Sequence, residues 1–157
     1  MPPGVVGDDM SEPETGTEAE SDAEPAATDD AAGPAPLVRR GDEVAYEAVG
    51  AADGLSKGVL IDAADGAPHF ALRRFTLAPG ARVPEHTNAV EHEQYVLEGE
   101  YVVGVGDEEH VVRAGDSLLI PAGVVHWYRN EGDEPGAFLC AVPNGDDAIE
   151  LVSDAGE

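Results

Sequence analysis

From Leu37 onward, short runs of Val, Leu, Ile, Phe and Tyr alternate with polar residues, and Gly, Pro and Asp separate the runs at close intervals. Alternation with a period of two, broken by turn residues, is typical of an all-β sandwich or barrel. Segments such as 78–81 (APGA) are predicted turns, and no stretch of ten or more residues has apolar positions at helical spacing. The predicted strands are residues 57–62, 69–77, 93–105 with a turn allowed at Gly99, 108–114, 116–122, 126–130 and 136–143.

Residues 1–36 have a different texture, consisting mainly of Pro, Glu, Asp, Ala, Ser and Thr. A segment of this composition buries too little apolar area to offset the entropy cost of ordering. We therefore predict two parts, a disordered acidic tail at residues 1–36 and a β-barrel domain at residues 37–157.

The chain has 33 acidic and eight basic residues, a net charge of -25 at pH 7, and both predicted parts have an acidic excess. Nucleic acid and anionic membranes are poor partners for such a surface. Carboxylates in place of lysine resemble the surfaces of proteins from halophiles that keep molar salt in the cytoplasm, where the Debye length falls to about 3 Å and repulsion is screened. We expect a halophilic protein.

The chain has a single cysteine, Cys140, so no disulfide can form within it. Nothing in the sequence points to an oxidising compartment. The first residues lack a basic segment followed by an apolar one, and no apolar run approaches the length of a membrane span. We therefore expect a cytoplasmic protein.

Residues 86–92 (HTNAVEH) bring two histidines and an asparagine close to a predicted strand. In a strand, residues i and i+2 share a face, so His86 and Asn88 can converge on one point inside a barrel, and a turn lets His92 approach it. His126 follows a Pro-x-Gly turn, and antiparallel barrel strands bring such distant residues together. Three imidazoles and an amide oxygen suit a first-row divalent metal and leave positions open, as catalytic sites do.

These residues lie in two motifs that resemble those of the cupin family, over about residues 57–142. The first cupin motif has Gly, five residues, His, one residue, His, three or four residues, Glu, six residues and Gly. The second has Gly, five residues, Pro, one residue, Gly, two residues, His, three residues and Asn. The matching positions here are Gly80, His86, Asn88, His92 and Gly99 in the first motif, and Gly115, Pro121, Gly123, His126 and Asn130 in the second.

The resemblance implies a cupin fold, a jelly-roll or double-stranded β-helix barrel, and a homodimer that pairs through its sheet edges. His92 stands where most cupins have Glu, which is similar to a subclass of small cupins that hold a metal with four histidines. Asn88 stands where that subclass has its second histidine. Because an amide oxygen is a harder and weaker ligand than imidazole, we expect Mn or Fe(II) rather than Cu or Zn. Water and Glu91 are the alternative fourth ligands.

Four residues are candidates for substrate binding. Cys140 shares a strand face with Phe138 and Val142, and is either a buried small apolar residue or part of the cavity wall near the metal. Tyr128 shares the face of His126, so its hydroxyl either orients a substrate or belongs to the core.

Three other polar positions complete the expectations. His69 and His110 fit neither motif, and both are expected to be solvated. Arg73 and Arg74 are adjacent, so one should face the barrel interior, where a guanidinium needs an anionic partner such as a substrate carboxylate.

The sequence therefore predicts a metal-dependent enzyme that acts on a small aromatic or oxygen-rich molecule. We expect oxygenase-like chemistry, with decarboxylase and isomerase activities as neighbouring options. The alternative is a non-catalytic cupin that binds a small molecule and whose metal site is weakened by Asn88.

Overall fold

The computed structural model describes residues 34–145 and 149–152. Within these residues the chain forms antiparallel strands and two short 3-10 helices, and no described helix has the length and apolar character needed to cross a membrane. The elements in chain order are η2 (Gly41–Glu43), β1 (Tyr46–Ala48), β2 (Asp53–Ile61), η3 (Ala63–Asp65), β3 (Phe70–Asn88), β4 (His92–Glu98), β5 (Glu100–Val105), β6 (Glu108–Arg113), β7 (Ser117–Ile120), β8 (His126–Arg129), β9 (Gly136–Pro143) and β10 (Ile149–Leu151).

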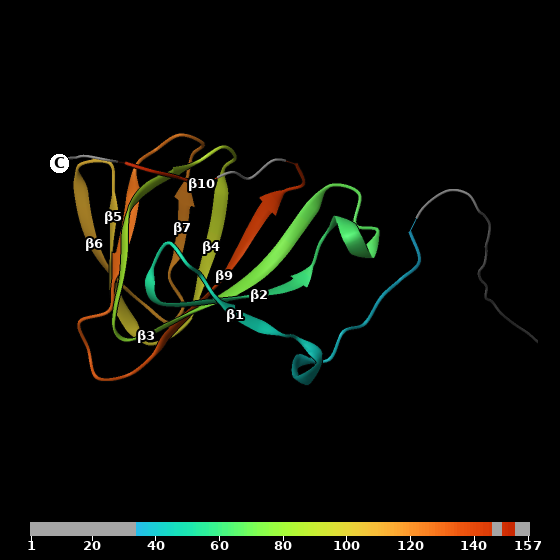
Figure 1. Cartoon of the computed structure of the whole chain (residues 1–157), viewed down its shortest axis with the longest axis horizontal. Helices are drawn as coiled ribbons and strands as arrows, with labels where there is room; N and C mark the ends of the chain where they lie inside the picture. Colours follow the sequence, from blue (N-terminus) through green and yellow to red (C-terminus); the bar gives the residue numbers. More distant parts are fainter. Residues whose placement is uncertain (1–33, 146–148, 153–157) are drawn as a thin grey trace, which may run out of the picture. The chain divides into compact units, whose positions relative to one another are not determined.

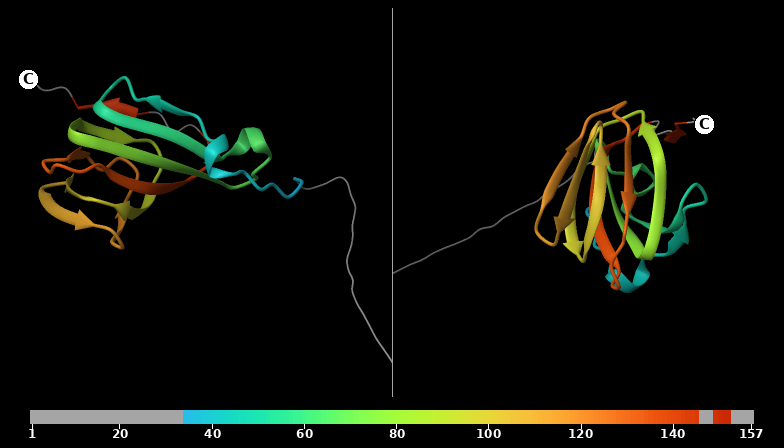
Figure 2. Two further views of the ribbon diagram at one scale, coloured as in Figure 1. Left: turned by 90° about the horizontal axis from the view of Figure 1, so that it is seen from below. Right: turned by 90° about the vertical axis from the view of Figure 1, so that its left-hand side faces the viewer.

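The strands form one curled sheet in the order β6-β5-β8-β3-β9-β4-β7. The long strand β3 belongs to both sides of the curl, as Figure 1 shows. Its first part, residues 70–77, pairs with β2 and β9, and its second part, residues 82–88, pairs with β8 and β10. The two sides face each other across the interior, which Figure 2 shows end-on. The prediction of an all-β barrel-like fold is therefore confirmed.

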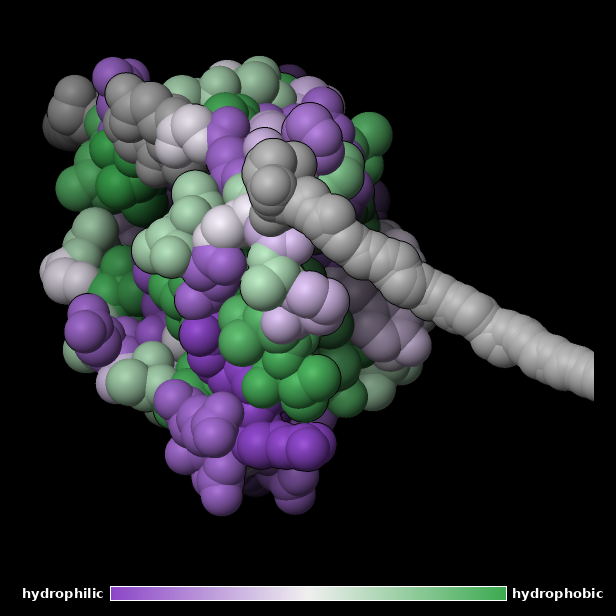
Figure 3. Space-filling model, turned by 90° about the vertical axis from the view of Figure 1, so that its right-hand side faces the viewer, coloured by the Kyte–Doolittle hydropathy of each residue, from purple (hydrophilic) through white to green (hydrophobic). Residues whose placement is uncertain are grey.

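The core fills the space inside the curled sheet. Alternate residues of β9 point inward, so that Phe138, Cys140 and Val142 are buried while Leu139 and Ala141 are partly exposed. Cys140 is therefore fully buried, which both interpretations given above require. Among the described residues no Asp or Glu is buried. Figure 3 shows hydrophilic residues gathered at the lower end of one face, beside hydrophobic patches.

The sequence pattern located most strands but not all of their ends. The predicted turn at residues 78–81 was wrong, because these residues lie inside β3, where the positive φ of Gly80 (82°) lets the strand bend without ending. The allowed turn at Gly99 (φ 84°) does separate β4 from β5. Strands β1 and β10 were not predicted, since each has three exposed residues and therefore no alternation of burial. The predicted tail falls mainly on residues 1–33, outside the described residues.

Gly99 occupies a position where backbone conformation and space both exclude a side chain. A Cβ there would lie 2.7 Å from the Gly136 Cα and would also overlap the Pro135 carbonyl oxygen. We expect Gly99→Ala to lower the free energy of unfolding by about 2–5 kcal/mol, from the left-handed backbone together with overpacking. Gly106→Ala is the matched control, since Gly106 also has a positive φ but nothing within 4 Å, and it should cost only about 1 kcal/mol. Denaturant unfolding at constant salt measures both, and equal losses would contradict the steric argument.

Candidate metal centre and ligand cavity

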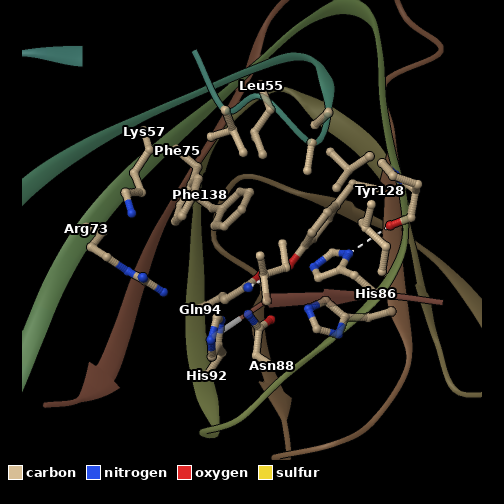
Figure 4. A pocket seen from close by; sticks show the side chains of 18 residues that line it. Leu55, Lys57, Arg73, Phe75, His86, Asn88, His92, Gln94, Tyr128 and Phe138 are labelled. Atoms are coloured by element: carbon tan, nitrogen blue, oxygen red, sulfur yellow. Dashed lines mark hydrogen bonds between the residues drawn. The ribbon is translucent and has the colours of Figure 1, made fainter. Parts of the chain in front are cut away.

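A cavity of about 160 Å³ lies inside the curled sheet, with residues from β2, β3, β4, β8, β9 and β10 in its wall. Figure 4 shows that His86, Asn88 and His92 lie at one end and that Lys57, Arg73 and Phe75 approach from another side. The lining residues are Val49, Ala51, Ala52, Leu55, Lys57, Arg73, Phe75, Val83, Pro84, His86, Asn88, His92, Gln94, His126, Tyr128, Phe138, Ile149 and Leu151.

A bulge in β3 turns His86 and Asn88 toward this cavity. Up to Val83 the buried residues of β3 are odd-numbered, whereas after Pro84 and Glu85 they are even-numbered. The pairing with β8 shifts over the same residues, between Val83 and His86. An inserted residue reverses which face the following side chains occupy. His86 and Asn88 therefore point inward because of the bulge.

Strand pairing brings the three histidines of the motifs together. His86 on β3 is directly opposite His126 on β8, and their ring centroids are 4.1 Å apart. His92, at the start of β4, has its ring centroid 6.1 Å from that of His126. The three rings and Asn88 are between 1% and 8% exposed, so all four predicted metal ligands lie in one buried site.

Backbone carbonyl groups orient two of these rings. The Nδ1 of His86 lies 2.7 Å from the Pro84 carbonyl oxygen, and the Nδ1 of His126 lies 2.9 Å from that of Val124. A carbonyl oxygen only accepts hydrogen bonds, so Nδ1 carries the proton and the lone pair of the neutral ring is on Nε2. Metal-binding histidines have this arrangement, in which the outer nitrogen donates and the inner nitrogen coordinates.

His92 is oriented by a different group. Its Nδ1 lies 3.3 Å from the Cys140 Sγ, and Nη2 of Arg73 donates to the same sulfur at 3.5 Å. Arg73 and Gln94 are the register neighbours of Cys140 on β3 and β4, so the three residues form one row across the sheet. Cys140 therefore connects His92 with Arg73, although it is not among the lining residues.

Asn88 and Gln94 each present an amide oxygen that lacks a partner. Both oxygens are buried, and neither accepts a hydrogen bond from any described residue. The backbone of Asn88 is fixed, since its carbonyl oxygen accepts from the Gly123 N–H at 2.9 Å. A buried acceptor without a donor costs about 1–3 kcal/mol, so a ligand, a metal ion or water is the expected partner of each oxygen.

The donor types in this site fit a first-row divalent metal, with three imidazoles and an amide oxygen. Among residues 34–145 and 149–152, no group of three or more His, Cys, Asp or Glu side chains is placed so that it could hold a metal ion. Metal binding at these residues therefore stays a prediction.

The other candidates divide between the cavity and the surface. Phe138 and Tyr128 line the cavity, whereas Val142 lies in the core outside the lining. Glu91, the alternative ligand, is exposed and is not among the residues that line the cavity. His69 and His110 are exposed, as expected.

Tyr128 remains a phenol at neutral pH. Burial raises the pKa of its hydroxyl, and the hydrogen bond that Gln94 Nε2 donates to it at 2.7 Å opposes this effect only in part. The ring of Tyr128 stacks on Phe138, with centroids 5.3 Å apart, so the aromatic wall of the cavity is rigidly packed.

Sequence reasoning missed two polar residues of the cavity, Gln94 and Lys57. Gln94 follows His92 by two positions, so strand parity alone places both on the same face. Lys57 is opposite Phe75 in the pairing of β2 with β3, and β2 was expected only as a shorter strand. Leu55 and the β10 residues Ile149 and Leu151 were also missed, because their segments carried no clear pattern.

Comparison with known proteins agrees with this geometry. A family model described as a cupin domain matches residues 73–142. Polyketide synthase CurC of Streptomyces cyaneus is 36% identical over 82 residues, 52% of this chain and 51% of CurC. The polyketide cyclase RemF from Streptomyces resistomycificus aligns with a TM-score of 0.69 and 29% identity over 76% of this chain and 88% of RemF. Oxalate oxidase in complex with the substrate analogue glycolate aligns with a TM-score of 0.57 and 26% identity, over 64% of this chain and 56% of that one.

An antiparallel sheet curled around an interior cavity is the architecture of a small β-barrel, a class of fold that can enclose a ligand cavity. Residues 73–142 match the cupin domain, a stretch that includes β4 to β8 and most of β3 and β9. The chain spans only about a third to a half of the length of the curated relatives that it matches.

Proposed function

We propose that the protein is a metal-dependent enzyme that acts on a small aromatic or oxygen-rich molecule, with oxygenase-like chemistry. His86, His92, His126 and Asn88 would hold one divalent transition metal, with Mn or Fe(II) favoured by the amide oxygen. One observation carries the proposal: three buried histidines and Asn88 converge on one cavity, and the Asn88 amide oxygen has no hydrogen-bond donor among the described residues.

A bound metal with open positions would supply Lewis-acid or dioxygen chemistry. The chain's own residues bind and orient the substrate. Phe75, Tyr128 and Phe138 form an apolar wall that excludes water, and the Tyr128 phenol remains a hydrogen-bond donor because burial raises its pKa. The carbonyl groups of Pro84 and Val124 hold two histidine rings in place, which limits the rearrangement needed when a metal binds.

The size of the cavity supports a small substrate. Its volume of about 160 Å³ is close to that of an engineered protein cavity of about 150 Å³ that holds benzene. A single aromatic ring, or one end of a larger molecule, is therefore the largest group that fits. The polyketide and oxalate chemistry named for the similar structures also concerns oxygen-rich molecules.

Asn88 favours a second candidate, a non-catalytic cupin that binds a small molecule, because an amide in place of imidazole weakens a transition-metal site. Both candidates use the same cavity, so only turnover of a substrate distinguishes them.

Metal analysis and oxygen uptake test the first candidate. The full chain is purified in molar salt without chelator, and one part is stripped with chelator and reloaded with Mn(II) or Fe(II). We expect about one equivalent of metal and oxygen consumption with small phenols or dicarbonyl compounds, in the loaded protein alone. If the folded, metal-loaded chain turns over none of these compounds, the result would favour the second candidate, the non-catalytic cupin.

A further inference from the structure

The cavity wall has the opposite charge balance to the rest of the chain. The sequence has 33 acidic residues and eight basic ones, yet among the described residues the cavity lining contains Lys57 and Arg73 and no Asp or Glu. Lys57 is also the single lysine of the chain. Because a low-dielectric wall of one sign concentrates ions of the other sign, this cavity attracts a small anion that the outer surface repels.

Strand pairing places the two cations near each other. Lys57 on β2 is opposite Phe75 on β3, and Arg73 lies two residues before Phe75 on the same face. Such diagonal neighbours have Cα atoms about 7–8 Å apart, a distance that a carboxylate between two long basic side chains can bridge. Figure 4 shows both side chains extending from the same side of the cavity. Arg73 is 8% exposed and Lys57 is half-buried.

Gln94 supplies an acceptor across the cavity. It belongs to the row Arg73, Cys140, Gln94, two strand spacings from Arg73, which is about 9–10 Å between backbones. Its Nε2 donates to the Tyr128 hydroxyl, and its buried Oε1 accepts from no described residue. A ligand hydroxyl is the natural donor for this oxygen, because the surrounding wall is mainly aromatic and apolar.

We propose that the ligand of this cavity is a small hydroxylated aromatic carboxylate. Its carboxylate binds between Lys57 and Arg73, its ring lies against Phe75 and Phe138, and its hydroxyl donates to Gln94 Oε1. This inference shares only the cavity with the proposed function, and it adds the chemical class of the ligand that binds there. Neutral sugars and hydrocarbons fit this wall less well, because neither carries an anionic group that Lys57 and Arg73 can bind.

Binding to the metal-free chain tests this assignment separately from catalysis. Calorimetric titration of the full chain, treated with chelator, compares 4-hydroxybenzoate with 4-hydroxybenzamide, which has the same shape and no charge, and with benzoate, which lacks the hydroxyl. We expect 4-hydroxybenzoate to bind about tenfold or more tightly than the amide, because a charge-assisted hydrogen bond is lost. It should also bind more tightly than benzoate, and the preference for the acid should shrink as salt is raised.

Variants locate the effect. Arg73→Gln and Lys57→Gln should each weaken binding of 4-hydroxybenzoate about tenfold and bring the acid and the amide closer together. Gln94→Met should remove the preference for the hydroxyl. Arg74→Gln is the matched control, because Arg74 is on the same strand but contacts Glu98 at 3.7 Å and the Tyr46 hydroxyl at 3.4 Å on the outer surface.

Equal binding of acid and amide, or equal effects of the Arg73 and Arg74 variants, would overturn the proposal. So would the absence of binding by the folded, metal-free chain, even if the same preparation takes up metal and consumes oxygen. Lys57→Gln keeps the test decisive if Arg73→Gln does not fold, since Lys57 is only half-buried.

Discussion

A chain carrying both His86→Ala and His126→Ala is expected to bind less than about a tenth of the metal that the parent chain binds. The two residues supply directly opposed imidazoles with ring centroids 4.1 Å apart, and their removal leaves only His92 and Asn88. Even changes to groups that merely orient a ligand cost about 10–100-fold in metal affinity, so the loss of two ligands should abolish binding. Elemental analysis after purification in molar salt measures the effect.

A second double variant provides the control. His69→Ala with His110→Ala also removes two imidazoles, but both residues are exposed and lie outside the cavity. It should keep the full metal content, and its unfolding midpoint should still rise when metal is added, because a ligand that binds the folded state stabilises it. Equal metal content in the two double variants would show that the bound metal is not in the cavity.

The alternation of apolar and polar residues was enough to predict the class of fold, because each long strand buries one face. In β4 the buried positions are His92, Gln94 and Val96, a strict period of two. Strands β1 and β10 were not predicted. Apolar and polar residues alternate only where a strand buries one face, and all residues of these two strands are exposed. Their contribution is to flank the cavity, through the segment after β1 and through Ile149 and Leu151.

The residues predicted as metal ligands do lie together in the cavity, although one argument for their placement was incomplete. The alternation of side chains along a strand explained why His86 and Asn88 share a face. It did not explain why that face is the inner one. The bulge at Pro84 and Glu85 decides this, and a bulge depends on the pairing of β3 with β8 rather than on the local sequence. The family motif therefore predicted that these residues face inward, but it did not reveal the bulge that turns them.

The polar residues of the cavity illustrate a second limit. Arg73 and Arg74 were predicted to face opposite sides, and Arg73 is the inward one. Nothing local distinguished them, since the choice depends on the register of β3 against β9, in which Arg73 is opposite Cys140. The position of Lys57 in the cavity wall follows in the same way from the pairing of β2 with β3.

The Asn88→His variant is expected to bind its metal about 10–100-fold more tightly and to shift its preference toward Zn and Cu. Imidazole is a stronger and softer ligand than an amide oxygen, and Asn88 already points into the cavity beside His86 and His92. The backbone should hold the new side chain in place, because the Asn88 carbonyl oxygen accepts from Gly123 N–H. Competition against a chromogenic chelator measures the affinity for each metal.

The Asn88→Leu variant tests whether Asn88 coordinates the metal or only lies beside it. Leucine has the same number and branching of side-chain heavy atoms and removes the amide oxygen, which has no donor among the described residues. If Asn88 coordinates, affinity should fall in the order His, Asn, Leu, while the folded state of the leucine variant gains stability because an unsatisfied polar group is removed. If all three variants bind metal equally, the fourth position belongs to water, and Asn88 is available to accept a hydrogen bond from the substrate instead.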